Sequence, residues 1–194
     1  MDNKIYLIPG RNGRLGGFVG FTISRMGFEV YGRELLPPFF NLRFSDQIET
    51  IKKDLVSMFW DTEALLFGCS YGGYLLLHAL AELGPFPGKV LLFSPVLGSA
   101  KVKNQYGVIP PRAKKLLQLA RERKFPAPGY LEIHTGAEDQ GCDPHLAKQF
   151  GSFIPESKVH VVIDQGHQLK DIYRANIISK FLGISSPDVD QEDR

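Results

Sequence analysis

The chain has 194 residues, of which 43% are hydrophobic and 23% are charged, and its formal net charge is +2. These values predict one ordinary globular domain whose core needs no disulfide framework, and only two cysteines are present. The small net charge argues against nucleic acid as a partner. The sequence has no apolar run of about 18 residues, so we expect no membrane span. The N-terminus lacks a signal-peptide pattern, so we expect a cytoplasmic protein.

Short apolar runs alternate along the chain with longer stretches of helical periodicity. The expected strands are residues 5–8, 28–31, 64–67, 90–93, 130–134 and 159–163. The expected helices are about residues 14–26, 45–58, 71–83, 112–123, 144–153 and 170–182. Ser45 is expected to be the N-cap at the start of the second of these helices, and Asp143 the N-cap of the fifth.

Most of the expected strands lack polar alternation, which is typical of strands that are buried on both faces of a parallel sheet. The alternation of strands and helices predicts an α/β fold with a doubly wound, mostly parallel six-stranded sheet that is flanked by helices. We expect one domain over residues 1–184, followed by a disordered acidic tail over residues 185–194.

The strongest chemical signal is Gly68-Cys69-Ser70-Tyr71-Gly72, between an expected strand and an expected apolar helix. In this context the pattern predicts a nucleophile elbow, a tight turn that projects the serine hydroxyl above the sheet. Glycines two positions before and after the serine relieve crowding against the neighbouring strand and helix. The backbone N–H of Tyr71, at the helix N-terminus, can donate to a developing oxyanion. The alternative is a glycine-rich turn without chemistry.

A serine nucleophile needs a base and a carboxylate that orients the base. His167 follows the last expected strand and Asp139 follows the strand before it, so both loops open at the sheet edge that carries Ser70. Among the other acidic residues, Asp143 is expected to cap a helix and Asp164 to hold its loop. The remaining histidines are expected in structural positions, except that His134 could support the site from a strand end.

A second oxyanion donor is expected from the loop that follows the first strand. Gly10 allows the backbone to approach a substrate oxygen closely, and the N–H of Arg11 is the first candidate, with Asn12 as the alternative. A phosphate-binding loop is the competing interpretation, but the glycine spacing matches neither common phosphate fingerprint.

These motifs together resemble the α/β-hydrolase superfamily over about residues 4–182. The resemblance depends on Gly68–Gly72, on Gly136 with Asp139, on Gly166-His167 and on Pro9-Gly10. It implies a small, nearly lidless serine esterase-like protein that uses neither a metal nor an organic cofactor. It also implies Ser70 as nucleophile, Asp139 as acid, His167 as base, and Tyr71 and Arg11 as oxyanion donors. The chain departs from the family in having Pro9-Gly10 where His-Gly is usual, and residues 99–128 leave room for a small flap at most.

The expected function is therefore a serine hydrolase that cleaves a carboxylic ester or a related acyl bond of a small molecule through an acyl-enzyme on Ser70. A thioesterase or acyltransferase with the same residues, and a non-catalytic binding module, are alternatives. A metal hydrolase that uses His134, Asp139, Cys142 and His145 matches no strong zinc spacing. Basic residues concentrated in 101–125 either favour an anionic substrate or form a solvated helix face. The oligomeric state stays open.

Overall fold

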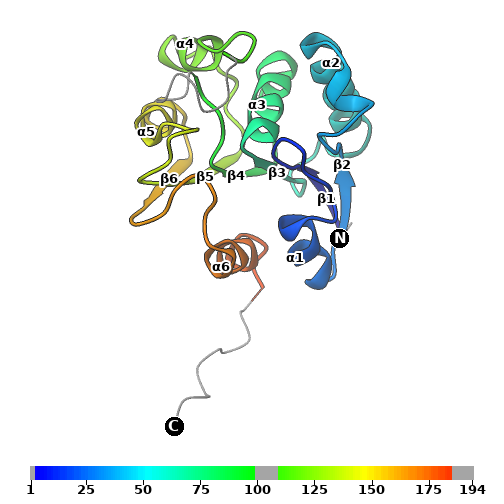
Figure 1. Cartoon of the computed structure of the whole chain (residues 1–194). Coiled ribbons are helices and arrows are strands. Elements are labelled where there is room, and N and C mark those ends of the chain that lie inside the picture. Colours follow the sequence, from blue (N-terminus) through cyan, green and yellow to red (C-terminus); the bar gives the residue numbers. More distant parts are fainter. Residues whose placement is uncertain (1–2, 99–108, 185–194) are drawn as a thin grey trace.

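The computed structural model describes residues 3–98 and 109–184. Six strands form one sheet in the order β2-β1-β3-β4-β5-β6 (Figure 1). Their bounds are β1 (Lys4–Ile8), β2 (Glu29–Gly32), β3 (Leu65–Cys69), β4 (Lys89–Phe93), β5 (Tyr130–Gly136) and β6 (Ser157–Val162). Every neighbouring pair is parallel, which confirms the expected sheet and all six strands.

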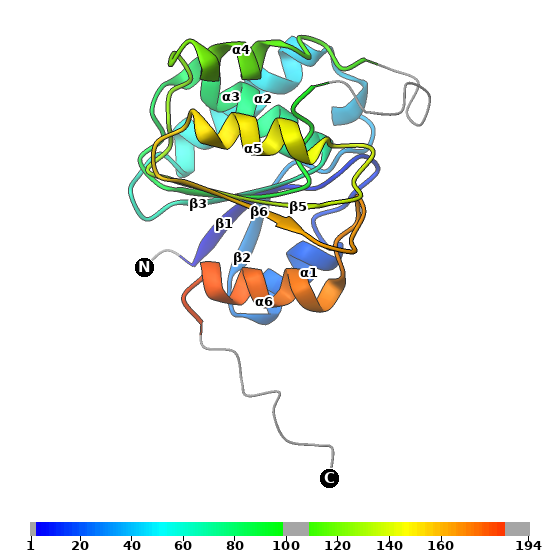
Figure 2. The ribbon, with the colours of Figure 1, turned by 90° about the vertical axis from the view of Figure 1, so that its left-hand side faces the viewer.

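Helices cover both faces of the sheet (Figure 2). Helices α1 (Phe18–Arg25) and α6 (Asp171–Phe181) lie on one face, and α2 (Phe44–Met58), α3 (Tyr71–Leu83) and α5 (Pro144–Ser152) lie on the other. Helix α4 (Lys115–Arg121) packs against α3 and α5. All six expected helices are confirmed, whereas the short 3-10 helix Phe39–Asn41 was not predicted. The expected tail over 185–194 and the first part of the expected flap, 99–108, lie outside the described residues.

Two apolar cores lie on the two faces of the sheet. The larger includes Leu66 of β3 together with Tyr74 and Leu76 of α3, and the smaller joins Phe67 of β3 to Ile178 of α6. Successive residues of β3 thus enter opposite cores, which explains why the interior strands are apolar without alternation. Helix α3 is buried from Gly72 through Leu80, as its apolar sequence predicts.

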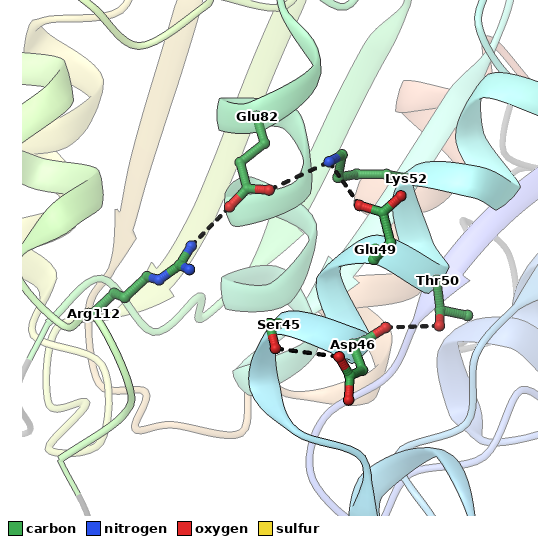
Figure 3. A network of polar contacts seen from close by, with 7 residues as sticks. All are labelled: Ser45, Asp46, Glu49, Thr50, Lys52, Glu82 and Arg112. Atoms are coloured by element: carbon green, nitrogen blue, oxygen red, sulfur yellow. Dashed lines mark hydrogen bonds and ion pairs between the residues drawn. The ribbon is translucent and has the colours of Figure 1, made fainter.

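The start of α2 differs from the expectation. Its N-cap is Arg43, so the prediction of Ser45 as the cap was wrong. The helix begins one residue earlier, at Phe44, whose ring packs 5.8 Å from that of Tyr74. Ser45 lies in the first turn, and its hydroxyl donates to a carboxylate oxygen of Asp46 at 3.3 Å (Figure 3). The helix therefore starts at the half-buried Phe44, which packs against the larger core, and no side-chain cap is present there.

Glu82 on α3 connects two other parts of the molecule (Figure 3). One carboxylate oxygen accepts from Arg112 at 2.7 Å and the other from Lys52 of α2 at 3.4 Å. The hydroxyl of Tyr74 also donates to the carbonyl oxygen of Pro111. These contacts, one near each end of α3, hold the segment that leads into α4 against this helix. No helix in the described part of the chain is long and apolar enough to cross a membrane.

Candidate active site

Ser70 lies in the turn between β3 and α3 with φ 49° and ψ −120°. This is a left-handed conformation that a residue with a side chain adopts only where the surroundings enforce it. The flanking glycines allow the turn, because a Cβ at Gly68 would lie 2.7 Å from the Cα of Gly73, and one at Gly72 would lie 2.1 Å from the carbonyl oxygen of Pro9. The turn therefore fits tightly between α3 and the end of β1.

Ser70, His167 and Asp139 form one hydrogen-bonded series. The Nε2 atom of His167 lies 3.0 Å from Oγ of Ser70. Its Nδ1 atom lies 3.0 Å from each carboxylate oxygen of Asp139. With a proton on Nδ1 donated to the carboxylate, Nε2 is left to accept the serine proton. The structure thus brings together the three residues that the sequence singled out.

The Asp139 carboxylate is only 1% exposed, and backbone donors hold it in place. Its Oδ1 atom accepts from the N–H of Gly141 at 2.9 Å and from that of Cys142 at 2.8 Å. Burial by itself raises the pKa of this carboxyl, but the hydrogen bonds from His167 and Cys142 outweigh it and hold the pKa below its usual value. The group is therefore charged at neutral pH, and it can stabilise an imidazolium.

The neighbouring acidic residues have other positions. Glu138 and Asp164 are exposed, and Asp164 takes a φ of 57° in its turn. Asp143 is the N-cap of α5 and accepts from the N–H of His145 at 2.9 Å, as predicted. Asp139 is the acidic residue that contacts His167.

The other histidines lie away from Ser70. His78 is buried in α3, where its ring centre lies 4.5 Å from that of Tyr74, and burial lowers its pKa to about 4. His145 is exposed on α5. His134 does not support the site, because its ring faces Tyr173 of α6 on the opposite side of the sheet. His134 and His145 also do not join Asp139 in a metal-binding group among the described residues.

The loop after β1 approaches the serine as expected. A Cβ built at Gly10 would lie 3.4 Å from the Cβ of Ser70, so the backbone of this loop passes close to the nucleophile. Arg11 lines the adjacent cavity, and Asn12 takes a φ of 61° in the turn. Tyr71 is the first residue of α3, and its N–H therefore has no acceptor within the helix.

A cavity of about 200 Å³ lies over Ser70 and His167. Its other lining residues are Arg11, Phe40, Tyr71, Val96, Gly98, Pro110, Pro111, Gly141 and Cys142. The sequence did not single out Phe40, Val96 or the two prolines. They could have been suspected, because the segments that follow β2 and β4 open at the same edge as Ser70. The cavity is mainly apolar, as is usual for a small-molecule site.

Arg11 is the cationic side chain among the described lining residues, apart from the titratable His167. Its guanidinium lies 5.3 Å from the ring centre of Phe40. The basic residues of the segment predicted to overhang the site are exposed, and among those described none lines the cavity: Lys114, Lys115, Arg121 and Arg123. The positive charge at the cavity therefore comes from the β1 loop and not from α4.

The two cysteines differ in their surroundings. Cys142 lines the cavity beside Ser70, and both burial and the charge of Asp139 raise the pKa of its thiol. Cys69 packs against the core on the α1 and α6 side, as expected for a small core residue, and burial raises its pKa to about 12. Both are free thiols that remain protonated at neutral pH.

Known proteins resemble this chain in structure but not in sequence. No model of a protein family matches this sequence, and no curated protein does so. Solved structures do match. A monoacylglycerol lipase from Paleococcus ferrophilus is 14% identical with a TM-score of 0.62, over 92% of this chain and 93% of its own. Alpha/beta hydrolase domain-containing protein 10 from mouse is 13% identical with a TM-score of 0.65, over 93% and 88%.

The esterase RhEst1 from a Rhodococcus species is 12% identical with a TM-score of 0.60, over 93% of this chain and 90% of its own. At this level of identity the similarity concerns the arrangement of the backbone. It agrees with the parallel sheet and with the helices on both of its faces. The chain has the α/β-hydrolase fold.

Proposed function

We propose that the protein is a serine hydrolase that cleaves a carboxylic ester through an acyl-enzyme on Ser70. The observation that carries this proposal is the continuous contact from Ser70 through His167 to the buried, charged Asp139. The lipase and the esterase with similar backbones support the class of reaction.

In the first half of the reaction, His167 accepts the Ser70 proton at Nε2 as Oγ attacks the carbonyl carbon of the ester. The new imidazolium is stabilised by the Asp139 carboxylate. The negative charge moves to the carbonyl oxygen, where the N–H of Tyr71 and that of Arg11 donate to it. When the tetrahedral intermediate collapses, His167 returns the proton to the leaving alkoxide, and the acyl group stays on Ser70.

In the second half, a water molecule takes the place of the alcohol. His167 removes a proton from it, the hydroxide attacks the acyl carbon, and the same backbone donors stabilise the second oxyanion. Collapse releases the carboxylic acid, and Oγ of Ser70 regains its proton from His167. The series needs no group beyond these side chains and backbone donors.

The cavity points to a substrate with a small acyl part. Its volume of about 200 Å³ is at or below the range of typical ligand sites, and the walls near Ser70 are apolar. We infer a short acyl chain of a few carbon atoms. A series of p-nitrophenyl esters of increasing chain length, compared by kcat/KM, would show this preference as a maximum at the short end. Matched thioesters in the same series separate an esterase from a thioesterase.

The direct test is covalent labelling with a fluorophosphonate probe, read by the intact mass of the protein. The wild type should gain one adduct, Ser70→Ala none, and His167→Ala should label much more slowly. His145→Ala, which changes an exposed histidine on α5, should label like the wild type. A folded wild type without any adduct would contradict the proposal and favour a binding module with a hydrolase fold.

A further inference from the structure

A second cluster of titratable side chains lies on the other face of the sheet. Glu132 and His134 extend from β5 and His160 from β6, and His134 is the register partner of His160. His134 contacts Tyr173 of α6, so the cluster faces the α6 layer rather than the cavity over Ser70. None of these residues takes part in the proposed hydrolysis.

The three side chains converge on a small volume. Oε1 of Glu132 lies 2.7 Å from Nε2 of His134 and 3.7 Å from Nε2 of His160. One potential ligand atom from each residue lies within 4.8 Å of the others. Tetrahedral zinc, with bonds of about 2.0 Å, holds its ligand atoms about 3.3 Å apart. The two distances from Glu132 lie on either side of that value, each within about half an ångström of it.

The sheet places the two imidazole rings of the cluster next to each other. The rings of His134 and His160 are stacked, with centres 4.5 Å apart and planes 10° apart. Register partners on adjacent strands lie at the ordinary strand spacing and project to the same face, so the two rings lie side by side. Because an imidazole binds a metal in the plane of its ring, the half-exposed ring of His160 has to turn out of the stack toward Glu132 before both histidines can bind one ion. Two imidazoles and one carboxylate form a ligand set that divalent transition metals favour.

Hydrogen bonds behind the ligands orient them. The Tyr173 hydroxyl lies 2.7 Å from Nδ1 of His134, and the Tyr130 hydroxyl donates to Oε2 of Glu132 at 2.8 Å. A metal ligand needs an unprotonated Nε2 on His134. The proton then lies on Nδ1 and can be donated to the oxygen of Tyr173. Such outer contacts fix the tautomer and the direction of a ligating imidazole.

We propose that Glu132, His134 and His160 bind one zinc ion or a similar divalent transition metal. The described residues contain one other group of possible ligands, Asp139, Cys142 and His167, which belongs to the site around Ser70. The ion at the β5–β6 cluster joins β5 to β6 by side chains. It thereby braces the two strands that precede the Asp139 and His167 loops. This metal takes no part in the hydrolysis, so the metal site and the proposed function are tested independently of each other.

The test titrates the full-length, chelator-treated protein with zinc in a calorimeter. One ion should bind per chain, and His160→Gln, a change at a half-exposed side chain, should weaken binding by more than about 100-fold. His145→Gln is the control and should bind zinc like the wild type. Tyr173→Phe should weaken binding by about 10- to 100-fold, since it removes only an outer contact. Lys158→Gln should strengthen zinc binding, because the positive charge of Lys158 disfavours a second positive charge at His160.

Cobalt identifies which cluster holds the ion. Bound cobalt should give the visible bands of tetrahedral coordination without a thiolate charge-transfer band, and Cys142→Ser should leave the spectrum unchanged. Zinc at about 100 times its dissociation constant should raise Tm by about 5 to 10 °C in the wild type and not in His160→Gln. Absence of binding, a thiolate band, or equal affinity of the wild type and His160→Gln would each overturn the proposal.

Discussion

The Nε2 atom of His167 lies 3.0 Å from Oγ of Ser70, although 97 positions separate the two residues in the chain. The parallel sheet makes this contact possible, because the loops that follow β3 and β6 open at the same edge. Glycines fix the position of Ser70 and a buried carboxylate fixes that of His167. The predictions below separate these contributions.

Asp139→Asn should lower kcat for a p-nitrophenyl ester by about 1,000- to 10,000-fold with little change in KM. The amide cannot stabilise the imidazolium, and it favours the histidine tautomer that presents a proton, rather than a lone pair, to Ser70. Steady-state kinetics at pH 7.5 would measure the change.

A neighbouring residue supplies the control for this substitution. Asp143→Asn keeps a good helix cap on α5 and should leave kcat within about twofold of the wild type. Equal activities of the Asp139 and Asp143 variants would remove Asp139 from the mechanism.

Gly72→Ala should destabilise the protein by about 1 to 3 kcal/mol. The added Cβ would lie 2.1 Å from the carbonyl oxygen of Pro9 and 2.3 Å from that of Ile8, so the helix would have to move away from the end of β1. Gly16→Ala has nothing within 4 Å of its added Cβ and should change stability by less than about 0.5 kcal/mol. Urea denaturation measures both, and similar values for the two variants would contradict the tight fit of the turn.

His78 should make the protein less stable as the pH falls from about 6.5 to about 4. Burial, with the nearby charge of Arg112, lowers its pKa from 6.5 to about 4, so in this window the unfolded chain binds a proton that the folded chain does not. Its contribution is fully present above pH 6.5 and decreases on acidification by up to roughly 3 kcal/mol.

Replacing this histidine isolates its effect. His78→Leu, of similar volume, should lose less stability between pH 7.5 and pH 5 than the wild type in urea denaturation. If the wild type and His78→Leu lost the same stability between these two pH values, folding would not lower the pKa of His78.

Arg11→Gln should lower kcat/KM for a short ester whose acyl chain ends in a carboxylate by about three- to tenfold, with little effect on a neutral ester of the same length. Arg11 lines the cavity, but it is exposed, so solvent and salt screen its charge. Arg14→Gln changes an exposed arginine in the same loop and should leave both substrates unaffected. An equal loss of kcat/KM for both esters would instead mean that the Arg11 side chain acts by positioning the backbone of its loop rather than through its charge.

Local patterns were enough to predict the main architecture. The strands were recognisable because interior strands of a parallel sheet are apolar on both sides, and the Ser70 turn carries its own glycine pattern. His167 and Asp139 could be selected because topology, rather than local sequence, determines which loops meet.

Features that depend on contacts between distant segments could not be predicted. Ser45 is a good capping residue, but the helix starts one residue earlier, where the half-buried ring of Phe44 packs against that of Tyr74. The cavity wall at Phe40 and Pro111 depends on how two connecting segments fold over the sheet edge. The cluster of Glu132 and His160 could not be predicted, because the pairing of β5 with β6 brings these residues together. No short sequence pattern specifies the register of that pairing.

The strand order has a consequence for how the protein is made. After β1, each new strand in sequence joins an edge of the sheet that is already present: β2 and β3 join the two sides of β1, and β4, β5 and β6 then add in turn. No strand has to enter between two that are already paired, so the sheet can grow as the chain leaves the ribosome. The strand order thus allows the turn that carries Ser70 to form on a partial sheet before His167 is synthesised. On the proposed mechanism, such a nascent chain would carry Ser70 in place but would lack the base that activates it.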